Sequence, residues 1–359
     1  MAAGDIIYRL EFVYTSDNAT FPGTKLAVDA QLYVPGLMFG KFYSSHFYKQ
    51  AQLLPQYKAN SANPSGHLKK KVSIAGTVIG FECAVVDGIP AYLGGLDSVT
   101  ADSPASDQFT LAANDDGDAP ETIWHKENNL MNNEQAREYD ECKCNEIDFT
   151  FKQLPTIPKV EELALVAQLQ IVGSREYDMT NDNVVQNTGT PARRGTSSPA
   201  SPFFLGKNNV TCTWNSKTLS NYFMGGSWGW KNDIGALLLN DGNDYPSGLA
   251  IGGRRQYKPA ALKFVQVDEA SDLDDIEQYV DGSTSSDLVL KITRRHASDY
   301  IQFTFKNAIL ESWNILPAPA DDVQDPVIDA LFHYTEIEVV DSLHDGSAMD
   351  PNADADYEL

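Results

Sequence analysis

Short runs in which apolar and polar residues alternate recur along this chain of 359 residues. Alternation with a period of two places every second side chain on the same face, which is typical of a strand with one buried face. The runs are rich in β-branched and aromatic residues, and Gly, Pro, Asn or Asp bound most of them, as turns require. We expect strands over residues 6–14, 72–81, 146–151, 163–172, 210–214, 262–267, 288–293, 300–305 and 332–340.

Helical periodicity is sparse. Residues 132–141 and 271–279 each predict a short helix, the second with Ser271 as its N-cap. Residues 158–170 are ambiguous, because their first part favours the start of a helix while their second half alternates like a strand. We favour a strand for that second half, so the chain is predicted to be mainly β with one or two short helices.

Three stretches lack a regular apolar period and are rich in turn-forming residues: 98–120, 178–202 and 315–326. Loops this long in a protein of this size commonly make contacts, so we expect them to be mobile loops or extended arms.

The chain is long enough for one large β domain or for two smaller ones. We predict a β domain over residues 1–340, with two similar halves as an alternative, residues 1–178 and 203–340 joined by a loop at 179–202. Residues 341–359 are acidic and poor in apolar residues, so they are predicted to form a tail that is disordered in the free subunit.

The charge is strongly acidic, with 50 Asp and Glu against 27 Lys and Arg, a net charge of −23 and a pI of about 4.5. Tight phosphate binding needs clustered cations, and the one basic run, Lys69–Lys71, is short, which disfavours DNA recognition. A strong negative field also keeps monomers soluble until a specific interface forms. The four cysteines, Cys83, Cys142, Cys144 and Cys212, lack the spacing of a zinc site and predict buried free thiols.

The sequence offers no convincing catalytic, cofactor or metal site. His296, Ser298 and Asp299 are close in sequence, but a catalytic triad requires convergence in space, so we predict a polar turn there. The acidic clusters at 114–118, 241–244 and 272–275 lack the spacing of a calcium loop. We also find no apolar run long enough for a membrane helix and no basic and apolar leader, which predicts a protein that starts in the cytoplasm without a membrane partner.

Two kinds of residue are candidates for contacts between subunits. Trp228 and Trp230 share one face of a strand, where they either form a sugar-stacking platform or fill a core or a subunit seam, and we favour the second. Pairs of arginines in an acidic protein suit carboxylates on a neighbouring copy, although a solvated pair on each loop is the alternative. The candidates are Arg193, Arg194, Arg254, Arg255, Arg294, Arg295, Trp228 and Trp230.

Several of these runs, taken in order, resemble the tail tube proteins of phages with long non-contractile tails. That family shows a strand with an N-x-x-L turn, a proline-led link to a glycine-rich turn, and a closing hairpin with an Asn-Ala step. The resembling segments cover about two thirds of the chain, and 15–62 and 178–202 match nothing in the pattern. They are Val210–Leu219, Tyr245–Arg255, Leu262–Val267, Asp287–Ile292, Tyr300–Trp313 and Phe332–Val340, with Glu141–Phe151 and Leu163–Val172 in the first half.

The resemblance implies a β-barrel or β-sandwich with a flanking helix and long loops or arms. It implies a non-enzymatic virion protein that self-assembles into hexameric rings, or trimeric ones if the chain is duplicated, stacked into a hollow tail tube in the host cytoplasm. The implied partners are other copies of the chain, a tape-measure protein, a tail terminator and baseplate or tail-tip proteins. DNA would pass through the lumen without specific binding, which an acidic wall favours because it repels phosphates.

Two other functions stay open. The first is a carbohydrate-binding or adhesin β-sandwich that uses Trp228 and Trp230. The second is another virion structural protein, such as a capsid, neck or tail-terminator protein.

Overall fold

The computed structural model describes nineteen segments of the chain. These are residues 8–14, 31–32, 41–44, 48–59, 62–75, 79–85, 88–98, 108–113, 122–128, 135–153, 163–173, 175–178, 202–206, 209–237, 248–251, 254–265, 276–294, 300–316 and 326–342.

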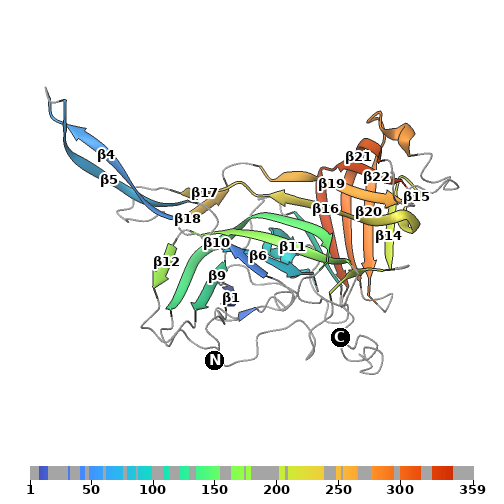
Figure 1. Ribbon diagram of the computed structural model, residues 1–359, viewed down its shortest axis with the longest axis horizontal. Helices are drawn as coiled ribbons and strands as arrows, with labels where there is room; N and C mark the ends of the chain where they lie inside the picture. Colours follow the sequence, from blue (N-terminus) through green and yellow to red (C-terminus); the bar gives the residue numbers. More distant parts are fainter. Residues whose placement is uncertain are drawn as a thin grey trace, which may run out of the picture.

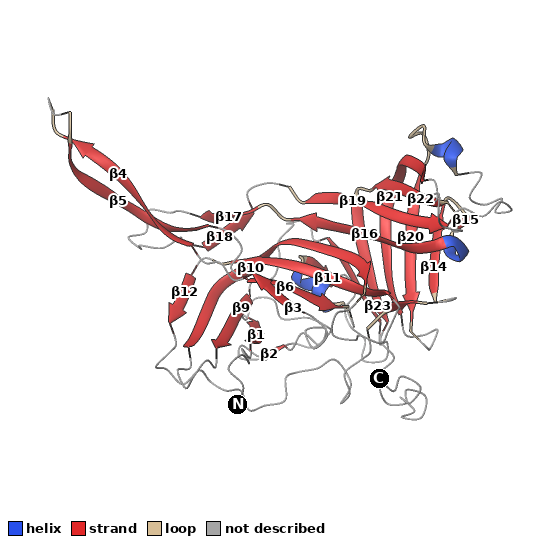
Figure 2. Cartoon of the chain, viewed as in Figure 1, coloured by secondary structure: helices blue, strands red, loops and turns tan. Residues whose placement is uncertain are grey.

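The described part is mainly β with almost no helix, which confirms the predicted class (Figure 2). In its first half the strands are β1 (Tyr8–Tyr14), β2 (Gln31–Leu32), β3 (Lys41–Ser44), β4 (Tyr48–Tyr57), β5 (Pro64–Ala75), β6 (Ile79–Ala84), β7 (Leu96–Ser98), β8 (Gln108–Ala113), β9 (Thr122–Asn128), β10 (Gln135–Lys152), β11 (Leu163–Val172) and β12 (Arg175–Asp178). In its second half they are β13 (Phe204–Leu205), β14 (Val210–Trp214), β15 (Lys217–Thr218), β16 (Phe223–Lys231), β17 (Ile234–Leu237), β18 (Gly248–Ile251), β19 (Gln256–Val265), β20 (Ser285–Thr293), β21 (Tyr300–Leu316), β22 (Val327–His333) and β23 (Glu336–Ser342). The helical elements are α1 (Ile89–Leu93) and the 3-10 turns η2 (Ser220–Tyr222) and η3 (Glu277–Tyr279).

Most strands form one antiparallel network that closes into a barrel. Along its wall, β6 pairs with β11, and the order continues through β10, β16, β19, β22, β21 and β20 to β14. The first part of β21 lies between β20 and β23, and β23 pairs in turn with β8. Asn209 ties β13 to β20, because its side-chain amide donates hydrogen bonds to the carbonyls of Phe204 (2.6 Å) and Thr293 (3.3 Å).

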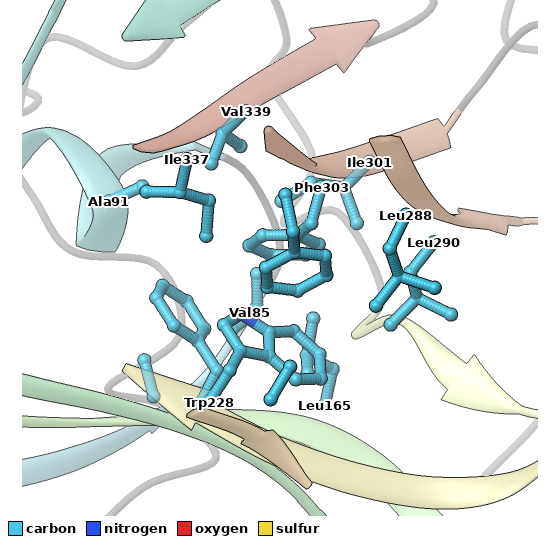
Figure 3. Packing of buried hydrophobic residues seen from close by; sticks show 14 of the residues in the cluster. Val85, Ala91, Leu165, Trp228, Leu288, Leu290, Ile301, Phe303, Ile337 and Val339 are labelled. Atoms are coloured by element: carbon cyan, nitrogen blue, oxygen red, sulfur yellow. The ribbon is translucent and has the colours of Figure 1, made fainter. Parts of the chain in front are cut away.

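The core lies between the two layers of this flattened barrel, where inward side chains of β10, β11 and β16 meet those of β20, β21 and β23 (Figure 3). Trp228 is central: its ring lies 4.9 Å from that of Phe303 in an edge-to-face contact and 5.9 Å from that of Phe149 in a stacked one. Such aromatic pairs add stabilisation beyond the area that they bury.

Helix α1 is held against the barrel at both ends by buried polar groups. At its start, the backbone N–H of Gly88 donates to the carboxylate of Asp341 in β23 (2.8 Å). At its end, the carbonyl of Gly94 accepts hydrogen bonds from Trp230 Nε1 (2.7 Å) and Asn232 Nδ2 (2.8 Å). A Cβ on Gly94 would lie 2.8 Å from the Trp230 ring, so the close approach requires glycine.

The strand predictions are largely confirmed, and the differences have physical causes. β11 and β14 match the predicted ranges residue for residue, whereas residues 72–81 hold the end of β5 and the start of β6. Residues 332–340 are likewise divided between β22 and β23, because a turn at Tyr334 and Thr335 separates the two strands.

The helix predicted at 132–141 was wrong. Gln135–Asp140 is instead part of β10 and pairs with β9 on one side and β12 on the other. Its Glu, Gln, Ala and Arg residues favour a helix locally, but pairing on both sides outweighs that propensity. The predicted loop at 98–120 was also wrong in part, since residues 108–113 form β8, which pairs with β23.

The remaining local predictions fall partly outside the described residues. Of the helix expected at 271–279, the structure describes the 3-10 turn η3, while Ser271 lies outside. The loop at 178–202 lies outside apart from its first and last residues, and Ile315 and Leu316 of the third loop belong to β21.

Strands from both sides of residue 179 share one sheet and one core. β10 pairs with β16, and β8 pairs with β23. The two proposed halves are therefore interleaved where the structure describes them, and the division into domains stays a prediction. β23 extends to Ser342, so the first two residues of the predicted tail form part of a strand, and 343–359 lie outside the described residues.

The side chain of Asn232 provides a test of how α1 is anchored. Besides Gly94, its amide donates to the carbonyl of Cys144 (2.8 Å) and its oxygen accepts from Arg255 Nε (2.9 Å). We expect Asn232→Ala to lower the free energy of unfolding by about 2–4 kcal/mol, because three hydrogen bonds are lost, two of them to buried carbonyls. Urea unfolding measures the change, with the exposed Gln256→Ala as the control; equal effects of the two substitutions would contradict this role.

Candidate assembly interface

A two-stranded hairpin made of β4 and β5 projects obliquely from one end of the body (Figure 1). Its register runs from Tyr48 opposite Ala75 to Tyr57 opposite Pro64. Among the described strands, β4 and β5 pair only with each other, so both outer edges of the hairpin carry unpaired backbone groups. Such edges are sites for pairing with another chain.

The hairpin tip is exposed to solvent. The described residues 55–59 and 62–65 are all exposed, and the side chain of Tyr57 is 60% exposed. An isolated two-stranded hairpin is only marginally stable in water, because it has no face to bury. Its length and its exposed tyrosine therefore favour a role in contact with another molecule.

The hairpin is also the basic element of an acidic chain. Residues 48–75 contain five lysines and none of the 50 acidic residues. The lysines are Lys49, Lys58, Lys69, Lys70 and Lys71. Outside the hairpin the chain is therefore more acidic than its net charge of −23 indicates, and the two parts attract each other.

A second exposed feature is a row of apolar side chains across the end of the sheet formed by β16, β19, β22 and β21. In this row Val265 lies opposite Val327, which in turn lies opposite Leu316. Met224 lies at the bulge where β16 leaves β19. We call Met224, Val265, Ile315, Leu316 and Val327 the apolar strip.

The apolar strip is unusually exposed for its composition. Met224 is 40%, Ile315 45% and Leu316 44% exposed, and with Tyr57 they are the exposed large hydrophobic side chains of the described part. The strip lies at the start of β16 and the end of β19, on the opposite side of the body from the hairpin tip (Figures 1 and 2). Leu316, Val327 and Val265 share one face of the sheet, whereas Ile315 lies opposite the buried Ile328 on the other face. Single exposed apolar residues are ordinary, but several at one end of a sheet point to an interaction site.

By contrast, charged groups on the outer faces of the barrel largely pair within the subunit. Lys258 Nζ lies 2.5 Å from both Glu146 and Asp148. Desolvation lowers the pKa of Lys258, but the hydrogen bonds to Asp148 and Glu146 outweigh it and raise the pKa above its ordinary value. This cluster is thus a structural ion pair rather than a pair of free carboxylates suited to acid–base chemistry.

The predicted contact residues differ in their exposure to solvent. Trp228 and Trp230 are 2% and 0% exposed and fill the core, which was one of the alternatives, so they offer no surface to a neighbouring subunit or to a sugar. Arg254 is exposed, as expected for a contact residue. Arg193, Arg194 and Arg295 lie outside the described residues.

Two of the candidate arginines make contacts within the subunit. Arg255 donates to Asn232 and to the carbonyl of Gly95 (2.6 Å), and the Arg294 guanidinium lies 4.0 Å above the ring of Phe203. Both side chains therefore contribute to the fold of the subunit, and their role in contacts between subunits, like that of Arg254, stays a prediction.

Neither the hairpin nor the apolar strip was predicted from the sequence. The signal for the hairpin was present: a run of 28 residues with five lysines and no acidic residue in an otherwise acidic chain. The strip had no such signal, because Met224, Ile315 and Leu316 belong to strands that also contribute to the core. Only the strand register shows that these residues lie at the same end of the sheet.

Nothing in the described part of the chain suggests a metal centre, since it brings no three His, Cys, Asp or Glu side chains together for one. The turn at His296–Asp299 and the acidic clusters at 114–118, 241–244 and 272–275 lie outside the described residues. Among the described helices, none has the length and apolar character needed to cross a membrane.

All four cysteines are free and buried, which confirms their prediction. Burial raises the pKa of Cys144 and of Cys212 to about 12, so both are protonated at neutral pH.

Comparison with known proteins gives little guidance. No protein-family model matches the chain, and no curated protein matches its sequence. Among solved structures, the chain is similar to a component of the anti-feeding prophage baseplate, with 9% identity, 36% of this chain and 89% of that chain covered, and a TM-score of 0.29. A similarity of this size is too small to assign a fold or a function.

The buried thiols lead to a prediction about reactivity. Because the thiolate is the reactive form and the pKa of Cys144 and Cys212 is about 12, we expect the folded protein to react very slowly with a disulfide reagent at pH 8. All four cysteines should react rapidly in denaturant. Absorbance of the released thiol measures both rates, and fast labelling of the folded protein would contradict the buried positions.

The hairpin tip should contribute little to the stability of the monomer. Because Tyr57 is exposed, we expect Tyr57→Ser to change the free energy of unfolding by less than about 0.5 kcal/mol. Trp228→Ala, which empties the core, should cost about 3–5 kcal/mol. Urea unfolding of the two variants distinguishes a contact residue from a core residue, and similar losses would show that Tyr57 supports the fold.

Proposed function

We propose that this protein is a structural subunit of a phage-tail-like particle that self-assembles into rings stacked as a hollow tail tube. The observation that carries the proposal is the projecting hairpin of β4 and β5, which has exposed edges and an exposed tip and pairs with no other described strand. A long arm of this kind gains its contacts from a neighbour rather than from its own body.

The body of the protein suits the wall of such a tube. Its strands close into one antiparallel barrel around a continuous core, which gives a rigid unit. The acidic composition supports passage of DNA through a lumen without specific binding, because a negative wall repels phosphates. Further proposed partners are a tape-measure protein, a tail terminator and baseplate or tail-tip proteins, in a virion assembled in the host cytoplasm.

The alternatives are weighed by the same residues. A sugar-binding sandwich loses its proposed platform, since Trp228 and Trp230 are buried. Another virion structural protein would share the β-rich body and the arm, and the shape of the assembly separates it from a tube protein. We propose no enzymatic activity; the half-buried carboxylates of Glu146 and Asp148 are paired with Lys258.

Negative-stain electron microscopy across a concentration and salt series tests the proposal. We expect hollow tubes or stacked rings, whose end-on views would give the symmetry, hexameric or trimeric. Persistent monomers, or closed particles without a channel, would contradict the tube function.

A variant with a shortened hairpin tests the observation that carries the proposal. Gln50 lies opposite Ser73, so an Asn-Gly turn joining these two residues would close a short hairpin without changing the register. We expect this variant to fold, as judged by circular dichroism, and to remain monomeric where the wild type assembles. Tubes formed by the shortened protein would show that the hairpin is dispensable for assembly.

A further inference from the structure

We infer that the β4–β5 hairpin of one copy docks onto the apolar strip of a second copy, so that the subunits associate head to tail. This inference rests on the proposed function and names the contact that would produce the assembly. Three independent observations support it: the placement of the exposed apolar groups, the segregation of charge, and an open strand edge beside the strip.

The first observation is placement. Tyr57 lies at the hairpin tip, whereas Met224, Ile315 and Leu316 lie at the far end of the body (Figure 1). An exposed tyrosine at one end of a molecule and an apolar strip at the other cannot meet within that molecule. They can meet between copies related by a translation or a rotation, and burying them removes apolar area from water.

The second observation is charge. The hairpin has five lysines and no acidic residue, while the rest of the chain carries all 50 carboxylates. Charges beside the strip are mixed: Glu311 in β21 lies 2.5 Å from His333, and Asp329 in β22 lies 3.9 Å from the exposed Lys263. The attraction of the basic arm to another copy therefore comes from the acidic composition of the body as a whole rather than from the strip itself.

The third observation is an open backbone edge. β21 pairs with β22 as far as Leu316, but on its other side its pairing with β20 ends where Ile309 lies opposite Ser285. In the described part of the chain, residues 311–316 therefore have a partner on one side only. A strand of the hairpin can pair with this edge, since its own outer edges are unpaired, and Tyr57 would then lie near the strip.

The geometry of the contact has a consequence for assembly. Each copy carries one hairpin and one strip, and the two surfaces differ, so the contact is heterologous and does not end with a dimer. Copies joined in this way close into a ring when the rotation between them allows it and otherwise extend as a filament.

Complementation between two variants tests the inference. The hairpin variant carries Tyr57→Asp and Lys58→Glu; the strip variant carries Ile315→Asp and Leu316→Asp. Each should be monomeric alone at concentrations where the wild type assembles, because each lacks one of the two surfaces. Mixed in equal amounts, they should form a 1:1 dimer, since one intact hairpin meets one intact strip and no free pair remains. Mass photometry measures the species.

The controls keep the outcomes distinct. Circular dichroism and thermal unfolding check that both variants fold, and Thr211→Asp, at an exposed position of β14, should assemble like the wild type. A mixture that stays monomeric would overturn the inference. If each variant alone still forms tubes, the inference fails while the proposed function stands; if the wild type itself never assembles, both fail.

A cross-link gives a second readout that does not depend on weakening the contact. Because the four native cysteines are buried, Tyr57→Cys and Leu316→Cys introduce the only exposed thiols of the described part. Under oxidising conditions a mixture of the two single variants should form a covalent dimer at least tenfold faster than either variant alone. Equal rates would overturn the inference, as would a hairpin that binds duplex DNA in preference to a second copy.

Discussion

The packing of Trp228 against Phe303 and Phe149 holds the two layers of the barrel together, and the other features of the structure depend on it. These rings come from β16, β21 and β10, so one cluster joins strands that are far apart in the sequence. Other parts of the same strands carry exposed features: β16 begins and β21 ends at the apolar strip, and β10 runs 18 residues to join the barrel wall to the pairs with β9 and β12. The core therefore fixes the positions of these features.

The network around the end of α1 shows how the same core is closed at one side. Trp230 uses its ring for packing and its N–H for the carbonyl of Gly94, while Asn232 bridges that carbonyl to Cys144 and to Arg255. The buried indole N–H of Trp230 and both ends of the Asn232 side-chain amide have partners in this network, which is the condition for keeping such groups inside a core. Of the two adjacent arginines, Arg254 is thus exposed, whereas Arg255 takes part in this network.

The alternation of apolar and polar residues predicted strands well where one face is buried, as in β11 and β14, because side chains on the buried face must be apolar. It failed at 135–140, where pairing on both sides overrides helix-forming residues. It also did not indicate the hairpin or the strip, because an exposed surface produces no period of buried positions in the sequence. For the hairpin the useful signal was charge segregation over 28 residues; for the strip it was the strand register, which appears only in three dimensions.

The four cysteines have a consequence for the chemical stability of the chain. Cys83, Cys142, Cys144 and Cys212 are all buried and form no disulfide. The fold therefore has no covalent bond that a reducing compartment could break and no accessible thiol that an oxidising medium could convert. A particle built from such subunits keeps the same covalent structure inside a cell and outside it.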